Sequence, residues 1–342
     1  NMPLNKKQFL EKEMKLIGEF TFNPYLEKEL DEKIRLVIHN NVKNEFSLLK
    51  VLESREVFVL NHDELESHYN YKYKYQKLDL DTKKWTDLGD GYRYLIPEIT
   101  DESGLKYAFY PSQNPSDYLV VCFQAIQATP KYNYIRKIAH INAHRLYIKD
   151  GYGNDENTHS SYYLNENNPI AVDDLVQSLI NAYVLALNIP KVNTIFIGSS
   201  KGGYAGLYHG YKFGAGHIIV GGPQTMLGDY LCVYSDASIR SPIFRGIFGE
   251  ENEMNKSYAN NLMYKVLENS EKPYPNATIL VGKGEPHYVE HAVPFMKWVD
   301  KLGISNVKWD FGDYDTHEEL AVHYPIFLEK SVKEIINSEV AQ

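Results

Sequence analysis

The feature that most constrains this chain is a short apolar run that ends in a glycine–serine turn. Residues 194–203 read Thr-Ile-Phe-Ile-Gly-Ser-Ser-Lys-Gly-Gly. The β-branched run predicts a buried strand, and the residues after it are compatible with a helix. Gly198, Ser200 and Gly202 match G-x-S-x-G, a pattern in which a serine lies on a tight turn between strand and helix. Side chains at the two glycines would hold strand and helix apart, so the pattern predicts an exposed, reactive Ser200.

Composition sets the class of protein. A chain of 342 residues with 43% hydrophobic content is long enough for a large core with an appendage, or for two domains. The formal charge of −9 argues against a nucleic-acid-coating surface, which needs an excess of cations.

Two cysteines, Cys122 and Cys232, cannot form a disulfide framework and favour a reducing compartment. Residues 2–11 contain no apolar signal segment, and no window approaches eighteen apolar residues, so we expect a cytoplasmic protein without a membrane span. The sequence does not indicate the oligomeric state.

Strands and helices are expected to alternate from about residue 92 onward. Strands are expected at 92–96, 105–110, 118–123, 145–148, 194–197, 217–220, 277–281 and 307–311, the first two forming a hairpin through 101–104. Helices are expected at 134–142, 173–187, from the turn to about 212, 289–302 and 318–337. This alternation predicts an α/β fold, a mainly parallel sheet covered by helices, with Ser200 at the end of the fifth strand.

Two regions fall outside the alternation. Residues 1–90 are expected to be an N-terminal accessory region of mixed α and β structure, with a charged helix first and strands near 36–38 and 57–60. Residues 91–342 form the main domain, interrupted by an insertion at about 223–272 that we expect to act as a cap over the site. Tyrosines alternate with other residues over 69–76, which predicts a strand with one aromatic face. We expect this face to pack on a neighbouring sheet; an aromatic platform for sugar rings is the alternative.

A serine hydroxyl needs a base to become nucleophilic, and the base needs a carboxylate that orients it. In this strand order the partners follow as serine, acid and histidine. Glu285 follows the strand at 277–281 and is the expected acid. His317 follows the strand at 307–311 and is the expected base.

Alternatives to both partners lie nearby in the sequence. Glu290 is the reserve acid, and Asp313 or Asp315 could orient His317 locally. Glu285 could also be a solvated loop carboxylate. His323 falls within the last expected helix, where a packing or surface role is expected.

Backbone N–H groups are needed to stabilise the charge that develops on the attacked carbonyl oxygen. We expect one from Lys201, directly after the serine, and a second from Gln124 or Ala125, in the loop after the third strand. The Lys201 side chain is expected at the surface, with contact to an anionic substrate as the alternative.

His287-Tyr-Val-Glu-His291 matches H-x-x-E-H, which on a helix places two imidazoles on one face for zinc, with Glu290 as base. It directly follows a strand of the expected sheet, and spacing marks no third ligand. We therefore expect no metal site. Gly214-Ala-Gly216 has the wrong order for dinucleotide binding and there is no P-loop, so no cofactor is expected.

Residues 92–337 resemble the α/β-hydrolase superfamily through the turn at Ser200, the Glu285 loop and His317. Gly198-Ser-Ser-Lys-Gly-Gly-Tyr-Ala-Gly-Leu-Tyr208 and Gly222-Pro-Gln-Thr-Met-Leu-Gly-Asp-Tyr-Leu231 are similar to segments of hydrolase-like proteins of bacterial capsular polysaccharide biosynthesis and of accessory secretion. This resemblance implies acyl transfer or ester hydrolysis on carbohydrate. An HGGG-type oxyanion loop is absent from the sequence.

The leading hypothesis is a serine esterase or O-acyltransferase that works through an acyl-enzyme on an acylated carbohydrate or small ester. Two other classes stay open. One is a non-catalytic hydrolase-like protein that binds a glycan or a partner, and the other is a zinc hydrolase that uses His287 and His291.

Overall fold

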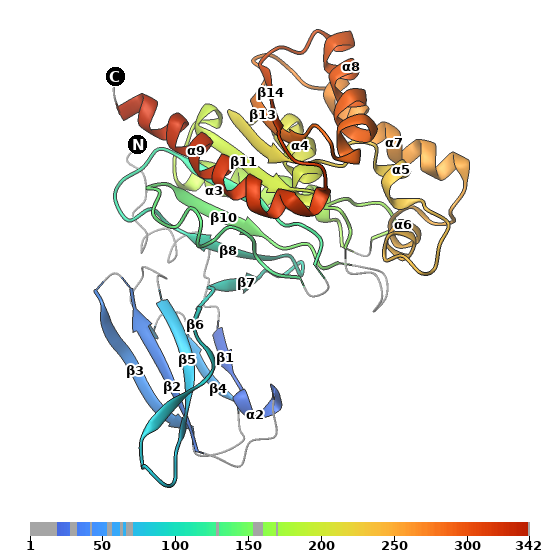
Figure 1. Ribbon diagram of the computed structural model, residues 1–342. Coiled ribbons are helices and arrows are strands. Elements are labelled where there is room, and N and C mark those ends of the chain that lie inside the picture. Colours follow the sequence, from blue (N-terminus) through green and yellow to red (C-terminus); the bar gives the residue numbers. More distant parts are fainter. Residues whose placement is uncertain are drawn as a thin grey trace. The chain divides into compact units, whose positions relative to one another are not determined.

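The computed structural model describes residues 19–27, 33–41, 43–52, 57–61, 64–65, 71–127, 130–152, 160–168 and 170–340 (Figure 1). The chain forms two compact units. Among the described residues, the large unit comprises 101–107 and those from 114 to 340, and the N-terminal unit comprises those from Glu19 to Thr100 together with 108–113. The helix expected at the start of the chain lies outside the described residues.

An eight-stranded sheet organises the part of the chain after residue 97. Its strands are β7 (Glu98–Thr100), β8 (Lys106–Tyr110), β9 (Leu119–Phe123), β10 (His144–Ile148), β11 (Thr194–Ser199), β12 (His217–Gly221), β13 (Asn276–Gly282) and β14 (Val307–Gly312). They lie in the order β14-β13-β12-β11-β9-β10-β8-β7, and the pairs from β10 through to β14 are parallel. Every residue of β9, β10 and β11 is buried, as expected for parallel strands covered on both faces. The predicted mainly parallel sheet is confirmed, with β11 fifth in chain order.

Helices cover this sheet (Figure 1). They are α3 (Val172–Ala186), α4 (Lys201–Phe213), α8 (Val293–Leu302) and α9 (Leu320–Val340), with short 3₁₀ turns at Lys191–Asn193 and His317–Glu319 and a π-helical turn at Tyr288–Ala292. The insertion contributes α5 (Leu227–Leu231), α6 (Arg240–Phe248) and α7 (Glu253–Glu268). Helices α4 and α9 both pack on β11 and β12, and α4 also packs on α7.

Two local predictions were wrong. Residues 134–142 form successive turns and bends, because Tyr134 has a positive φ of 65° and the short-range hydrogen bonds that follow span three or four residues irregularly. The hairpin through 101–104 is formed by β7 and β8, whereas Tyr92 to Tyr94 belong to a different sheet of the N-terminal unit.

The N-terminal unit contains two antiparallel sheets. One pairs β1 (Glu19–Phe22) with β4 (Phe58–Asn61), and a four-residue helix, α2 (Pro24–Glu27), follows β1. The other has the order β3 (Glu45–Leu52), β2 (Ile34–Asn40), β5 (Tyr71–Leu78) and β6 (Trp85–Tyr94). Their shared core is apolar and aromatic: Phe20, Phe22, Ile34, Leu36, Ile38, Leu52, Leu60, Tyr71, Tyr75 and Leu95.

The predicted aromatic face lies on β5. Tyr71 and Tyr75 are buried in the core, and Tyr73 packs against the same cluster. Phe22 of the two-stranded sheet meets the Tyr73 ring edge-on at a centroid distance of 5.5 Å. The described tyrosines of this face therefore pack between sheets, as expected.

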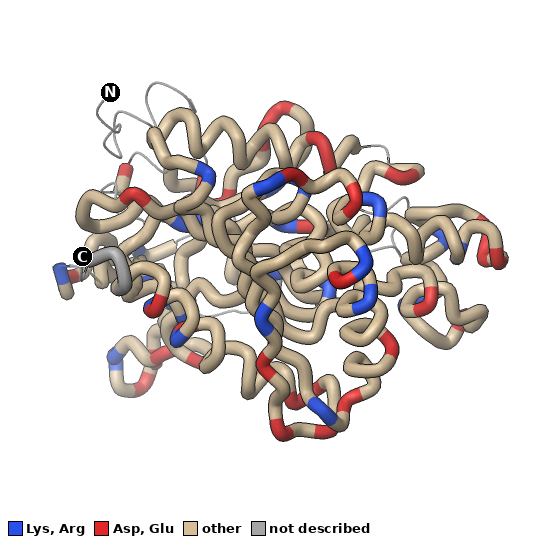
Figure 2. Tube along the Cα trace, turned by 90° about the horizontal axis from the view of Figure 1, so that it is seen from above, with Lys and Arg blue, Asp and Glu red and all other residues tan. Residues whose placement is uncertain are grey.

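Charge is mixed over the molecule. Figure 2 shows acidic and basic residues interspersed along the described parts of the trace. Among the described residues, none of the helices has the length and apolar character needed to span a bilayer.

Candidate active site

Ser200 lies on a tight turn between β11, which ends at Ser199, and α4, which begins at Lys201. Its φ of 56° is in the left-handed region, which is strained for a residue other than glycine. A Cβ at Gly198 would lie 2.3 Å from the carbonyl oxygen of Gly202, and a Cβ at Gly202 would lie 2.5 Å from the carbonyl oxygen of Phe123. Both glycines are therefore required for the helix to start this close to the strands, which leaves Ser200 half-buried at the edge of the sheet.

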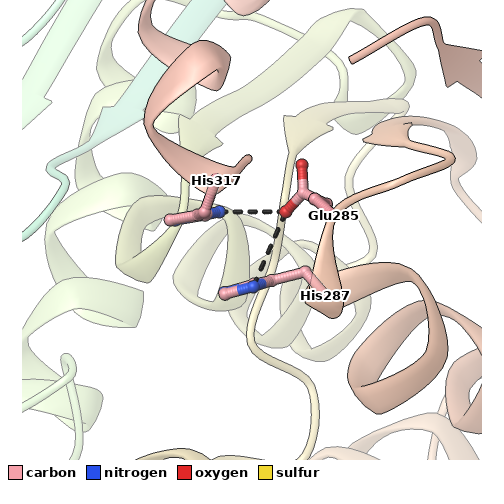
Figure 3. Close-up of side chains that lie close together, drawn as sticks. All are labelled: Glu285, His287 and His317. Carbon is pink, nitrogen blue, oxygen red and sulfur yellow. Dashed lines mark hydrogen bonds and ion pairs between the residues drawn. The ribbon is translucent and has the colours of Figure 1, made fainter. Parts of the chain in front are cut away.

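The structure brings Ser200, His317 and Glu285 into one line of hydrogen bonds. Ser200 Oγ lies 2.9 Å from His317 Nε2. Figure 3 shows the second contact, in which His317 Nδ1 lies 3.0 Å from Glu285 Oε1. Glu285 is 2% exposed, and its other oxygen accepts a hydrogen bond from the Gly282 N–H at the end of β13. His317 begins the 3₁₀ turn that follows β14 and keeps a quarter of its side chain exposed. The three groups thus come from the carboxyl ends of three parallel strands.

The alternative residues lie elsewhere. Glu290, Asp313 and Asp315 are exposed, and the Nδ1 of His317 faces Glu285. His323 lies in α9, where its ring stacks on Tyr314 at a centroid distance of 4.5 Å. That position agrees with the packing role expected for His323.

Gln224 is a site residue that the sequence did not reveal. Its side chain is completely buried, and its Nε2 donates a hydrogen bond to Ser200 Oγ at 2.5 Å. The same nitrogen lies 3.3 Å from His287 Nε2, while Oε1 accepts from the Tyr162 hydroxyl at 3.3 Å. Gln224 lies three residues beyond the end of β12, and loops at the carboxyl ends of parallel strands are where such residues gather. Its position after a strand of the sheet was therefore the one feature of the sequence that could have pointed to Gln224.

His287 joins Gln224 to the carboxylate. Its ring is parallel to that of His317, with an interplanar angle of 7° and a centroid distance of 3.8 Å, and its Nδ1 lies 3.6 Å from Glu285 Oε1 (Figure 3). Burial, followed by the positive charges that His317 and His291 could carry, lowers the pKa of His287 to about 2. A neutral His287 can accept at Nε2 from Gln224, whereas its Nδ1 is buried and makes no hydrogen bond to a described residue. Glu285 therefore lies beside two imidazoles and is hydrogen-bonded to that of His317.

The predicted oxyanion donors differ in their surroundings. The Lys201 N–H is in the first turn of α4, where backbone N–H groups have no partner within the helix. The Gln124 N–H donates to the Tyr163 hydroxyl at 2.9 Å, and the Ala125 N–H donates to Asn133 Oδ1 at 2.7 Å. Both of the latter amides are thus engaged within the protein.

The Lys201 side chain is buried, so the expectation of a surface lysine was wrong. Its Nζ lies 3.1 Å from Asp150 Oδ2, and both side chains are at most 3% exposed. Asp150 also accepts hydrogen bonds from Ser160 and from the N–H and hydroxyl of Ser161. The residue after the nucleophile is therefore fixed to the segment that carries Tyr162 and Tyr163, because a buried charge requires such partners.

The histidines fit a zinc ion poorly. Among the described residues, the group of three close potential ligands is Glu285, His287 and His317. An imidazole nitrogen binds a metal in the plane of its ring, and two parallel rings stacked 3.8 Å apart share no such plane. His291, the second histidine of the H-x-x-E-H match, is outside this group, and its Nδ1 accepts a hydrogen bond from the Met226 N–H. The π-helical turn between His287 and His291 also departs from the α-helical face that the match assumed.

A groove of about 590 Å³ borders this region within the insertion. It runs from Met226 along α7 to α8, and its lining includes Ser257, Tyr258, Asn261 and Trp298. Met254, Asn260 and Lys265 complete the lining, so the groove combines apolar, amide, hydroxyl and charged side chains.

No protein-family model matches the sequence, and no curated protein matches it. Solved structures do match. The capsule O-acetyltransferase of Neisseria meningitidis serogroup A is 21% identical over 72% of this chain and 97% of that chain, with a TM-score of 0.58. A mutant of that enzyme in complex with CoA is 20% identical over 69% of this chain and 94% of that chain, with a TM-score of 0.58.

The glycosylation-associated protein complex Gap123 of Streptococcus agalactiae is 16% identical over 94% of this chain and 62% of that chain, with a TM-score of 0.57. The chain therefore has an α/β-hydrolase fold like that of capsule O-acetyltransferase, as the resemblance implied.

Proposed function

We propose that this chain is a serine-dependent acyltransferase or esterase that works through an acyl-enzyme. The observation that carries the proposal is the line of hydrogen bonds from Glu285 through His317 to Ser200, at 3.0 and 2.9 Å. A serine within reach of a histidine that a buried carboxylate orients is the arrangement that acyl transfer requires.

In the first half-reaction, Ser200 Oγ attacks the carbonyl carbon of the acyl donor as its proton passes to His317 Nε2. Glu285 holds the Nδ1–H of His317 and stabilises the imidazolium that forms. The proton then moves to the leaving group as the bond from it to the carbonyl carbon breaks, which leaves Ser200 acylated. In the second half-reaction, His317 takes a proton from water or from an acceptor hydroxyl, and that oxygen attacks the acyl group. Ser200 is released with its proton restored.

We propose two donors to stabilise the oxyanion. The Lys201 N–H is the first, as the sequence predicts. Gln124 or Ala125 would have to give up an internal hydrogen bond to supply the second, whereas the Gln224 amide already contacts Ser200 Oγ. We therefore assign the second donor to Gln224 Nε2.

Transfer of an acyl group to a carbohydrate is favoured over simple hydrolysis. A fold neighbour is a capsule O-acetyltransferase, and a mutant of that enzyme was solved with CoA, which supports an acyl thioester as donor. The groove along α7, with Tyr258, Asn261 and Trp298 in its lining, offers a place for the sugar acceptor.

A non-catalytic binding role is the second candidate. The similarity to the Gap123 complex extends over 94% of the chain and so includes most of the N-terminal unit, which the capsule O-acetyltransferase does not cover to that extent. A binding protein of that kind would keep the fold without needing an active Ser200.

A fluorophosphonate probe distinguishes these functions. We expect covalent labelling of the wild-type protein and none of Ser200→Ala, with Ser238→Ala, a serine of the insertion, labelled as the wild type is. Labelling should persist after incubation with EDTA, because the proposed chemistry uses no metal. Absence of labelling in a correctly folded wild type would exclude the serine mechanism, and loss of ester hydrolysis on chelation would favour zinc. Acetyl-CoA incubated with and without oligosaccharide acceptors then separates transfer from hydrolysis.

A further inference from the structure

Arg240 lies at the end of a row of rings that leads to the catalytic histidine. It is the first residue of α6, and its guanidinium carbon lies 4.2 Å from the centroid of the Tyr230 ring. Tyr230 in turn contacts the rings of His287 and His291, at centroid distances of 5.7 and 5.8 Å. His287 stacks on His317 at 3.8 Å. Arg240 is therefore separated from His317 by two aromatic layers, on the side of the site that the insertion forms.

Among the described residues, no carboxylate forms an ion pair with Arg240, although its side chain is half-buried. Arg245 of the same helix shows the contrast, because it pairs with Asp236 at 3.2 Å and with Glu251 at 2.7 Å. An arginine side chain carries a positive charge, and within the described part of the chain no ion pair offsets that of Arg240.

That charge acts on the site. Burial is the first cause of the lowered pKa values of His287 and His291, and the charge of Arg240 contributes to both. It also acts on the hydroxyl of Tyr162, the residue that donates to Gln224. Arg240 thus lies close enough to the Ser200 site for its field to be felt there.

Packing on Tyr230 uses only one face of the guanidinium. A cation–π contact of this kind contributes about 0.5 to 1 kcal/mol when partly exposed. One guanidinium N–H donates to the Tyr230 hydroxyl, and the remaining donors lie in the plane of the guanidinium, in the fork arrangement that matches the oxygens of phosphate or carboxylate. A half-buried arginine with a supporting ring, further N–H donors and no ion pair to a described carboxylate has the properties of an anion-recognition residue.

We infer that Arg240 binds a phosphate or carboxylate group of a substrate of the Ser200 site. This inference rests on the proposed function for the identity of that site. The anionic group belongs either to the acyl donor, such as the phosphates of a CoA thioester, or to the acceptor, such as a sugar phosphate or a uronic acid. In both cases the guanidinium holds the anion at the insertion while the reacting group reaches Ser200.

Equilibrium binding tests the inference without requiring turnover. In a Ser200→Ala background, calorimetric titrations with CoA, glucose 1-phosphate, glucuronic acid and uncharged glucose measure affinity before and after Arg240→Gln. We expect at least one anionic compound to bind and to lose at least tenfold in affinity in the Arg240→Gln protein. Arg240→Lys, which keeps the charge without the fork, should recover only part of that loss, and Arg245→Gln should bind like the parent. If Arg240→Gln weakens the binding of CoA, the anionic group that Arg240 binds belongs to the acyl donor. If it weakens the binding of glucose 1-phosphate or glucuronic acid, that group belongs to the acceptor.

Thermal unfolding of each variant is measured alongside. If Arg240 only packs on Tyr230, Arg240→Gln will lower Tm without changing the affinity for any anion, which would overturn the inference. Absence of binding by all three anionic compounds would also overturn it. Because these titrations do not depend on Ser200 chemistry, their failure is distinct from a failure of fluorophosphonate labelling of the wild type.

Discussion

Glu285 provides the sharpest test at the level of a single residue. Glu285→Gln keeps the volume of the side chain but presents an amide to His317 Nδ1 in place of the carboxylate 3.0 Å away. We expect kcat for p-nitrophenyl acetate to fall about 10⁴-fold, because His317 loses both its tautomer and the stabilisation of its imidazolium. Glu290→Gln, on the exposed carboxylate, is the matched control and should retain wild-type kcat. A fall in kcat of less than tenfold for Glu285→Gln would mean that a group other than Glu285 orients His317.

Gln224 is predicted to act on kcat rather than on KM. Gln224→Ala removes the donor at Ser200 Oγ, and loss of one oxyanion donor costs about 10² to 10³ in kcat. The KM for a small neutral ester should change by less than about threefold, because the donor acts mainly on the transition state. Steady-state kinetics on p-nitrophenyl acetate measure both, with the surface variant Gln113→Ala as control. An increase in KM at constant kcat would show that Gln224 binds the ground state instead.

The difference between what the sequence predicts at this scale and what it misses has a physical basis. Ser200, Glu285 and His317 each follow a recognisable strand, and parallel strands bring their carboxyl ends together whatever the side-chain details. Gln224 and His287 are 63 positions apart and carry no local pattern that links them. Their contact depends on how the π-helical turn and the loop after β12 pack, which spacing along the chain does not encode.

At the level of elements, the buried pair of Lys201 and Asp150 connects the start of α4 to the segment after β10. Asp150→Asn would leave the Lys201 ammonium buried without a counter-charge, and we expect a loss of about 3 to 5 kcal/mol in the free energy of unfolding. Lys201→Met combined with Asp150→Asn should recover a large part of it, because no buried charge remains. Urea denaturation measures both, with Asp236→Asn, on an exposed carboxylate, as control. If the double variant is no more stable than Asp150→Asn, the pair is not the source of the loss.

The elements themselves show where the sequence predicts structure reliably. The central strands appear as unbroken apolar runs because both of their faces are covered. The boundaries predicted for β13 and β14 agree with the structure within one residue, and those predicted for β11 agree within two. The segment 134–142 contains enough apolar residues for a helix, but Tyr134 has a positive φ and the backbone hydrogen bonds that follow form successive turns. Tertiary packing overrides local propensity there.

At the level of the whole molecule, the buried histidines of the site couple its chemistry to stability. Burial lowers the pKa of His287 to about 2 and that of His291 to about 4, from 6.5 in the unfolded chain. Between pH 6.5 and 4 the unfolded chain therefore binds protons at these positions that the folded chain does not. Stability must fall as the pH falls through this window. Each histidine contributes a loss of about 2 kcal/mol between pH 7.5 and pH 5.

Urea unfolding at a series of pH values from 7.5 to 5, followed by the fluorescence of Trp298 and Trp309 in the large unit, measures this loss. His287→Gln should be less sensitive to pH than the wild type by about 2 kcal/mol over the range, whatever its stability at pH 7.5. His140→Gln, on a histidine with half of its side chain exposed, is the matched control and should follow the wild-type curve more closely. Equal pH sensitivity in His287→Gln and the wild type would mean that His287 is not held neutral. Its Nε2 would then carry a proton and could not accept a hydrogen bond from the Gln224 amide nitrogen, which lies 3.3 Å away.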